Sequence, residues 1–460
     1  MEENGCNWKL KARKRSVHDH FEIMESLGPH TCMNPSITQD HSNLKSSDIA
    51  EAIRAQIIAD PNIKEKVLLA TAENLFGYHP NRKKIRNAKK IVMEDVHGSW
   101  EGSYSGLPYL MEMLQCFNNG TKVDWLFKKD EMRERLFWAL KPCIDGFEHC
   151  IPVILIDWTH LYGPYPGVLL SATSVDGFSH LLPLAFAIVE AENMSSWGWF
   201  MDRLRRFVAG TSLQTFEQLV AAEPMTTEWF EDKPLKKWSL AHDGGKRFGI
   251  MTTNHAESWN NAIIEAQNLP ITSLVRALFE KLVDYFDARR VEIATQTLNG
   301  QIFTKVANMK LIRAISRASG HHVKLFDRDT WLFQVTTKRD GLKGGNNHTI
   351  RIHEQTCTCG KWQNYHIPCS HVIACCAHVK MTHDKLVDDC YKLENISKIY
   401  NGVFEPIPNK GDPRWPTQLN FPKVIHDEGV QKKKGRRKST RFKNEMNFQE
   451  PRGKKSNSTP

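Results

Sequence analysis

The spacing of four cysteine and histidine residues near the C-terminal end constrains the fold of this chain more than any other feature. The segment CTCGKWQNYHIPCSH holds a Cys-x-Cys pair, nine intervening residues and a Cys-x-His pair, and its side chains are Cys357, Cys359, Cys369 and His371. Alternate side chains of an extended strand share one face, so the first pair can face a single ion. Structural zinc takes four such ligands in a tetrahedron. The pattern therefore predicts a small zinc-stabilised module.

The residues that follow this pattern favour a helix. Pro368 precedes Cys369, and the apolar run HVIACCAHV comes after it. The positive end of such a helix favours the thiolate form of a ligand. Cys375 lies one turn beyond His371 and is an alternative ligand, although packing in a short helix is the preferred interpretation. The alternative to a zinc site is a set of four unconnected buried residues.

Composition limits the remaining possibilities. The chain has 460 residues, of which 40% are hydrophobic, and a formal net charge of +10. This length predicts two to four domains, and a modest positive excess fits a polyanion such as DNA without proving one. The apolar runs IPVILI and LLPLAFAIV are shorter than the roughly 20 residues of a membrane-spanning helix. We expect a soluble intracellular protein with reduced thiols, no membrane partner and no small-molecule substrate.

Hydrophobic periodicity divides the chain into a helical part and an α/β part. The segment SSDIAEAIRAQIIADPNIK has helical spacing, the basic stretch HPNRKKIRNAKK follows, and further helix is predicted through EMRERLFWAL. IPVILID, GVLLSATSVDG and HLLPLAFAIVEAEN read as three strands, the last two joined by a turn at Asp176 and Gly177. MSSWGWFMDRLRRFV then predicts a helix with Trp197, Phe200 and Leu204 on one face. Three strands and a helix open an α/β domain.

These features occur in an order that resembles a known family. The Cys/His pattern is similar to the SWIM-type zinc finger, which serves DNA or protein contacts. GSWEGSYSGLPYLMEML, LPLAFAIVEAENMSSWGWFMDRL and RFGIMTTNHAESWNNAIIEAQNLPI, followed by the finger, resemble plant-type Mutator-like (MULE) transposases over most of residues 6–410. The resemblance implies a multidomain α+β and α/β fold. It would contain a partial RNase H-like α/β domain with helical flanks, a small SWIM module and a disordered basic tail.

The resemblance also implies catalytic residues, and one group of them is missing. Family members cut and join DNA with three carboxylates that hold two divalent metals, for which Mg²⁺ is suited. The first carboxylate maps onto Asp157, whose alternative role is a strand-end cap. The block that carries the second Asp is not found. Glu257 is the candidate for the third, or else part of a helix capping box. We therefore expect vestigial catalytic residues, a poor nuclease, an exposed edge beside the first strand, and Mg²⁺ only if the chain is active.

Both ends of the chain are candidates for contact with DNA, the first through a resemblance and the second through its charge. Residues 1–45 are similar to half of a zinc-binding DNA-recognition domain, and Cys6, His30 and Cys32 match three of its four ligands. This implies a possible second zinc site, with Lys9, Lys11 and Arg13 among the basic residues that can touch phosphates. The tail predicts nuclear import or phosphate contact, and therefore a nuclear protein, through Lys432, Lys433, Lys434, Arg436, Arg437 and Lys438.

The predicted organisation has five parts. They are a partial DNA-recognition domain (residues 1–45), a helical region (46–150), an incomplete transposase-like domain (151–300), a SWIM finger (335–380) and a basic tail (405–460). The favoured interpretation is a zinc-binding, transposon-derived protein that binds DNA and has lost catalysis. One alternative is an active metal-dependent transposase whose second carboxylate is unrecognised. The other is a SWIM-based module that binds proteins.

Overall fold

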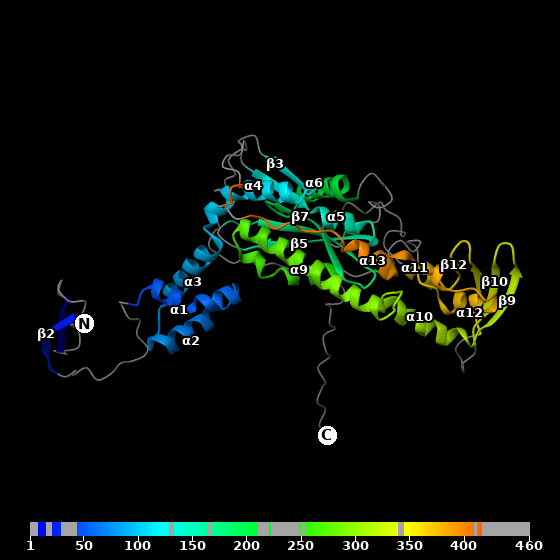
Figure 1. Ribbon diagram of the computed structural model, residues 1–460, viewed down its shortest axis with the longest axis horizontal. Helices are drawn as coiled ribbons and strands as arrows, with labels where there is room; N and C mark the ends of the chain where they lie inside the picture. Colours follow the sequence, from blue (N-terminus) through cyan, green and yellow to red (C-terminus); the bar gives the residue numbers. More distant parts are fainter. Residues whose placement is uncertain are drawn as a thin grey trace, which may run out of the picture.

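The computed structural model describes most of the chain between residues 44 and 408 and shorter pieces on either side, namely residues 8–14, 21–28, 44–127, 133–162, 165, 167–209, 220–221, 248–250, 254–338, 345–408 and 412–415. Figure 1 shows these parts in a row. An N-terminal hairpin of β1 (Lys9–Lys14) and β2 (Phe21–Leu27) comes first. A helical bundle, a central sheet and a second, smaller sheet follow.

Three helices form a bundle with a core of its own. They are α1 (Ser46–Ala59), α2 (Glu65–Phe76) and α3 (Arg82–His97). Apolar residues recur at helical spacing on each of them, and the buried set is Ile49, Ala50, Ile53, Ile57, Leu68, Ala72, Ile85, Ala88 and Val92, with Leu44 beside it. Gly77 ends α2 in the left-handed conformation, with φ of 70°, which glycine adopts without steric cost. The predicted helical character of this stretch is confirmed.

The segment after the bundle differs from the helical expectation for residues 46–150. The helix α4 (Trp100–Phe117) is followed by two strands, β3 (Lys122–Phe127) and β4 (Arg133–Ala139), and by the short helix α5 (Lys141–Phe147). The prediction of helix through EMRERLFWAL is therefore wrong. β4 lies inside the sheet between β3 and β7, where both of its faces are covered. A short apolar run of this kind does not distinguish a buried strand from a helix.

The central sheet contains the three strands that the apolar runs predict. They are β5 (Ile151–Leu161), β6 (Gly167–Val175) and β7 (Leu181–Val189), paired antiparallel in sequence. The full order is β3-β4-β7-β6-β5-β8. The two-residue strand β8 (Val220–Ala221) runs parallel to β5 opposite Leu155 and Ile156. β5 is therefore paired on both sides at this point, where an exposed edge was expected.

An ion pair between a buried arginine and a half-buried glutamate fastens the middle of this sheet to the segment after β7. Arg135 on β4 is 3% exposed and donates to both carboxylate oxygens of Glu190, at 3.0 and 2.7 Å. It also donates to the backbone carbonyl oxygen of Ser195 at 2.8 Å. Burial alone would raise the pKa of Glu190, but the bonds and charge of Arg135 hold this pKa below its usual value.

Helices cover the central sheet and lead away from it. The predicted helix after β7 is α6 (Met194–Leu204), which continues into the π-helical turn η1 (Arg205–Ala209) and buries Phe200 and Leu204. α8 (Asn254–Ala262) and the turn η4 (Ala266–Asn268) precede the long helix α9 (Ile271–Leu298). In Figure 1, α9 runs along the sheet and α10 (Lys305–Ala318) continues towards the second sheet. A search of the described helices for a membrane-spanning segment found none.

The second sheet carries the predicted zinc ligands. Its strand order is β12-β11-β10-β9, and two short helices pack beside it. It starts at His322, before the expected boundary at residue 335. The elements are β9 (His322–Asp327), β10 (Leu332–Thr336), β11 (Asn347–Arg351), β12 (Thr356–Cys357), α11 (Lys361–Tyr365) and α12 (Ser370–His378).

After the second sheet the chain returns to the central sheet. The turns η5 (Asp384–Leu386) and η6 (Asp389–Tyr391) lead to α13 (Leu393–Ile399), which packs against α5. Asp176, in the turn between β6 and β7, is fully buried and accepts a hydrogen bond of 2.8 Å from the Tyr400 hydroxyl. Burial raises the pKa of Tyr400 well above its usual value, so the hydroxyl stays a neutral donor. This return makes the second sheet an insertion within the central fold.

Candidate metal centre and central carboxylate

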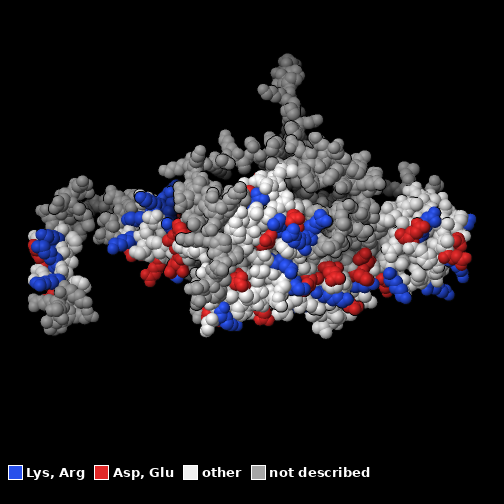
Figure 2. All heavy atoms as spheres, turned by 90° about the horizontal axis from the view of Figure 1, so that it is seen from above, with Lys and Arg blue, Asp and Glu red and all other residues white. Residues whose placement is uncertain are grey.

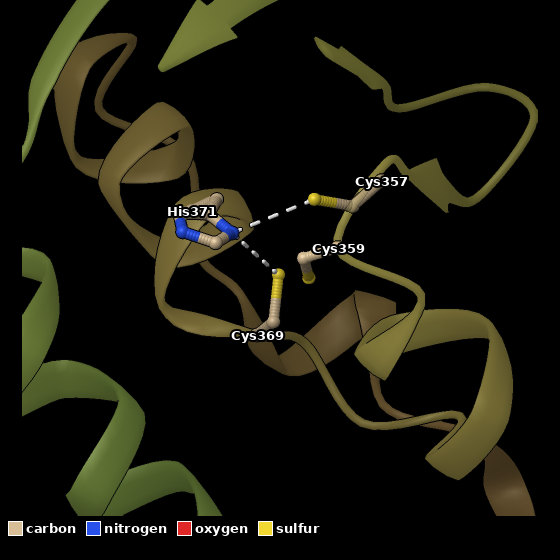
Figure 3. A group of neighbouring side chains, drawn as sticks. All are labelled: Cys357, Cys359, Cys369 and His371. Carbon is tan, nitrogen blue, oxygen red and sulfur yellow. Dashed lines mark hydrogen bonds between the residues drawn. The ribbon is translucent and has the colours of Figure 1, made fainter. Parts of the chain in front are cut away.

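The structure brings the four predicted zinc ligands together. Figure 3 shows His371 and Cys369 at the start of α12, facing two cysteines from the opposite segment, which are Cys357 and Cys359. The His371 Nδ1 atom lies 3.6 Å from the Cys357 Sγ atom and 3.7 Å from the Cys369 Sγ atom. All four donor atoms lie within 4.8 Å of one another. The cluster is largely buried, so its donors face one another rather than solvent.

Local backbone structure places each donor. Cys357 ends the short strand β12, and a turn at Gly360 follows, with φ of 72°, in the left-handed region that favours glycine. The backbone N–H of Gly360 donates to the Cys357 carbonyl oxygen at 2.9 Å, which tightens the turn that carries Cys359. Cys369 is the N-cap residue of α12, as the sequence predicts, and His371 lies in the first turn of that helix. One hairpin-like turn and one helix start therefore supply two donors each.

The donor spacing fits a zinc ion. With Zn–S of about 2.3 Å and Zn–N of about 2.0 Å, tetrahedral geometry places sulfur and nitrogen ligands about 3.5 Å apart. The sulfur–nitrogen distances of 3.6 and 3.7 Å agree with this spacing. Three thiols and one imidazole are also donors that zinc prefers over the oxygen ligands of magnesium or calcium. Cys357, Cys359, Cys369 and His371 would hold the ion, which would cross-link β12 to α12 as a structural zinc does.

Crowding of the thiols makes their protonation unequal. Hydrogen bonds with Cys359 and Cys369, and then burial, raise the pKa of Cys357 far above its usual value. Bonds received from Cys357 and Cys369 lower the pKa of Cys359. Without an ion, the hydrogen bonds among the clustered thiols therefore oppose full deprotonation of the cluster. Zinc binding has to displace the remaining thiol protons, which makes the affinity of the site pH-dependent.

Neighbouring side chains support the His371 ring. His348 on β11 and His321, just before β9, lie with ring centroids 4.1 and 5.0 Å from that of His371, in near-parallel orientation. The Nε2 atom of His321 lies 3.0 Å from the Ser370 hydroxyl. Cys375, the alternative ligand, is buried in the hydrophobic core of the module and outside the group of four. Burial raises the pKa of Cys375 above its usual range, as expected for a packing thiol.

The central carboxylate has a different environment. Asp157 lies on β5, as predicted, and is half-buried. Its Oδ2 atom accepts a hydrogen bond of 2.7 Å from the side-chain amide of Asn260 on α8, and its Oδ1 atom accepts one of 2.8 Å from the Trp158 backbone N–H. The same amide also donates to the Trp158 carbonyl oxygen at 3.1 Å. Asn260 therefore fastens α8 to β5 through the predicted catalytic side chain.

Glu257, the candidate third carboxylate, lies on α8 one turn before Asn260 and is exposed. It belongs to the first turn of that helix, in keeping with its alternative interpretation as a residue of the helix start. Sequence reasoning did not find Asn260. The sequence did contain a signal for it. Asn260 follows Glu257 by three residues in NHAESWNN, and residues three apart on a helix lie on the same side of it.

The remaining predicted site residues lie outside the described residues. This applies to the three candidate ligands of a second zinc, Cys6, His30 and Cys32, and to the basic tail Lys432, Lys433, Lys434, Arg436, Arg437 and Lys438. Of the basic residues near the N-terminus, Lys9, Lys11 and Arg13 lie on the exposed strand β1. The Nζ atom of Lys11 pairs with Glu25 on β2 at 2.6 Å.

Two protein-family models match parts of the chain. Residues 153–223, which include Asp157 and β8, match the MULE transposase domain. Residues 342–380, which include the whole Cys/His cluster, match the SWIM zinc finger. The chain is thus a transposase-like protein with a zinc finger, and the two matches together support a Mutator-like transposase family protein. Searches of curated proteins and of solved structures found no significant match.

Proposed function

We propose that this chain is a zinc-dependent DNA-binding protein, descended from a transposase, whose central site does not cut DNA. The observation that carries the proposal is the bond between Asp157 and Asn260. A carboxylate that binds a divalent metal needs its oxygens free and other acidic oxygens nearby. Here an amide N–H group, which is a hydrogen-bond donor and no metal ligand, occupies one oxygen of Asp157 at 2.7 Å.

The strand arrangement supports descent from a nuclease of the RNase H-like type. Such a sheet begins with three antiparallel strands, as β5, β6 and β7 do, and adds a parallel strand beside the first, as β8 does. The first catalytic acid of that architecture belongs to its first strand, where Asp157 lies. We therefore propose that the chain keeps the sheet of such a nuclease but has lost the catalytic activity. The block expected to contain the second Asp is missing from the sequence.

A strand-cleavage assay tests the loss of catalysis. The full chain is incubated with supercoiled and linear DNA in Mg²⁺ or Mn²⁺, beside Asp157→Asn. We expect no metal-dependent cleavage from either protein. Cleavage by the unchanged chain that disappears in Asp157→Asn would overturn the proposal and establish the alternative, an active transposase in which Asp157 holds the metal.

DNA binding and a nuclear location are parts of the same proposal. The net charge of +10 and the basic tail support contact with phosphates, and the SWIM finger supports contact with DNA or protein. Affinity for duplex DNA should fall steeply with salt if phosphate contacts dominate. A flat salt dependence would favour the alternative of a protein-binding SWIM module. A fluorescent fusion with and without residues 432–438 tests nuclear import, which should require the basic run.

A further inference from the structure

The α1–α3 bundle is a separate small module whose third helix is basic. Its hydrophobic core is distinct from that of the central sheet. The sequence of α3 begins RKKIRNAKK, and six of those nine residues are Lys or Arg. Its first turn contains no acidic residue. Figure 2 shows Lys and Arg side chains on the part of the surface that this module forms, with acidic side chains beside them.

The basic side chains of α3 lie opposite the core. Ile85, Ala88 and Val92 are buried against α1 and α2. A helix turns about 100° per residue, which places the solvent-facing side on the opposite half of the circumference. The exposed residues there over the first three turns are Arg82, Lys83, Arg86, Asn87 and Lys90. This face is polar throughout those turns, and its members are four cations and one amide.

Most of this charge is available to a ligand. Arg82 and Lys83 have no ion-pair partner among the described residues. Lys90 pairs with Glu94 at 3.5 Å, an exposed contact between residues four apart. Arg86 is bound more firmly, by a hydrogen bond of 2.9 Å to Glu65 on α2. Exposed pairs of this kind contribute little and exchange readily for a phosphate.

We propose that α3 is a DNA-reading helix that binds duplex DNA through this face. An α-helix fits the major groove of B-form DNA, and modules of short helices commonly place one helix there by its N-terminal residues. α3 has 16 residues and is about 24 Å long, enough for its first turns to enter the groove. Arg82, Lys83 and Lys90 would contact phosphates, and Asn87 has the amide that pairs with the edge of adenine. The inference rests on the proposed DNA binding and assigns it a surface.

The chemistry of the face favours DNA over an acidic protein partner. A helix that binds a protein groove presents apolar anchors at its centre. The exposed apolar residues of α3, Ile91 and Val96, lie beyond the basic turns, towards the C-terminal half. The first turns offer only charge and one amide. Double-stranded RNA is a poorer fit, because its deep, narrow major groove does not admit a helix.

The bundle is also fixed beside the central site. The side chain of Asn62, between α1 and α2, donates to the Ile264 carbonyl oxygen at 3.4 Å and accepts from the side chain of Asn268. The adjacent Gln267 accepts from the Tyr162 backbone N–H, just after β5, at 2.9 Å. DNA held on α3 would therefore have a defined position relative to Asp157, as a transposase ancestor would need.

The test measures binding of the full, zinc-loaded chain to a 30-base-pair duplex by fluorescence anisotropy over a salt series. The test variant carries Arg82→Gln, Lys83→Gln and Lys90→Gln, which keep the side-chain stems and the helix propensity. The matched control carries Lys305→Gln, Arg313→Gln and Arg317→Gln, three exposed cations on α10, so it changes the net charge equally. Thermal unfolding of each variant shows whether the fold is intact.

The α3 variant should bind about tenfold or more weakly near 0.1 M salt, and its log–log salt slope should be shallower by about 3 units, since each phosphate contact contributes about 0.9. The α10 control should stay within about twofold of the unchanged chain. Equal losses in both variants would overturn the inference and leave the proposed DNA binding intact. No binding by the unchanged chain would overturn both, and tighter binding to duplex RNA would reject DNA as the ligand. Arg82→Lys as a single change should retain binding, and its failure would show that charge alone is insufficient.

Discussion

The Cys/His cluster and the Asp157 site are both built from residues typical of metal centres, yet their surroundings are opposite. In the cluster, four soft donors lie within 4.8 Å of one another and the nearest side chains support them. At Asp157, the side-chain amide of Asn260 and the Trp158 backbone N–H both donate to the carboxylate. The cluster comes from 15 consecutive residues, 357–371, whereas Asp157 and Asn260 are 103 residues apart.

A local site and a distributed site differ in what each requires from the rest of the chain. A local site needs only a turn and a helix start, so its geometry survives changes elsewhere in the chain. A distributed site depends on every segment between its members. Loss of one such segment removes a carboxylate but leaves the hydrophobic sheet that carried the others, because that sheet is stabilised by its own burial.

Removal of one zinc ligand should have the largest effect. Cys369→Ser should reduce bound zinc from about one ion per chain to nearly none and unfold the module of β9 to α12. Structural zinc contributes about 10 kcal/mol or more of apparent binding free energy to such modules. Metal analysis of the purified chain, together with near-ultraviolet circular dichroism, measures both changes.

The matched control for this change is Cys375→Ala, on the same helix. It removes a buried thiol outside the cluster and should keep the ion. Zinc that persists in Cys369→Ser, or that is lost in Cys375→Ala, would show that the ligand set is assigned wrongly.

Removing the partner of the buried Arg135 in the central sheet should have the next largest effect. Glu190→Ala leaves Arg135, which is 3% exposed, without its counter-ion, and should cost about 3 kcal/mol of unfolding free energy. Urea unfolding at pH 7 measures the loss. Arg206→Ala, which removes an exposed partner of Asp202, should change stability by less than about 0.5 kcal/mol.

The same pair makes a prediction about pH. The pKa of Glu190 is depressed in the fold, so its ionised form stabilises the sheet above the unfolded-state pKa of about 4.3, and this contribution is lost as pH falls further. Glu190→Gln should remove that part of the acid sensitivity. An unchanged acid dependence would mean that the pair does not stabilise the sheet.

A smaller effect is expected where the chain returns from the zinc module to the sheet. Tyr400→Phe removes a hydroxyl that donates to the buried carboxylate of Asp176, and should cost about 1–3 kcal/mol. Denaturant unfolding of the zinc-loaded chain measures it. Tyr162→Phe, at a half-exposed ring, is the control and should be nearly neutral. Equal stability of both variants would show that this junction does not hold the two regions together.

The smallest effect is expected from a variant that makes the Asp157 site more similar to a metal centre. Asn260→Asp places a second carboxylate beside Asp157 and should create weak affinity for Mn²⁺. If the dissociation constant is near 1 mM, 10 mM Mn²⁺ would stabilise the variant by about 1.4 kcal/mol. A melting-temperature rise with Mn²⁺ would be seen in this variant alone. Asn261→Asp, at an exposed neighbouring position, is the control, and an equal response there would mean that the amide is not what separates Asp157 from a metal.

The sequence predicts features that depend on neighbouring residues better than features that depend on distant segments. The spacing within CTCGKWQNYHIPCSH contains the full ligand set of the cluster, because strand, turn and helix start are all local. The long apolar runs of β5, β6 and β7 predicted those strands and the turn between the last two. The position of Asp157 on the first strand followed from its place after four apolar residues.

The features that sequence reasoning missed depend on packing at a distance. β4 contains Leu136, Phe137 and Trp138 in succession, and only its place between β3 and β7 makes it a strand. The two residues of β8 carry no periodicity that could indicate a strand. The contact between Asn260 and Asp157 requires α8 to pack against β5, which no local pattern specifies.

The return of the chain after the zinc module has a consequence for how the gene can change. A reading frame that stops before codon 393 loses α13 and Tyr400, and with them the cover of the turn at Asp176. Any truncated transcript without the finger therefore also encodes a central sheet with an uncovered end. Splicing that removed codons 322–380 alone would keep both flanks and join them directly. Of these two ways to lose the finger, the internal excision keeps α13 and Tyr400, but it still removes Ile367, Ile373 and Ala374 from the core of the central sheet.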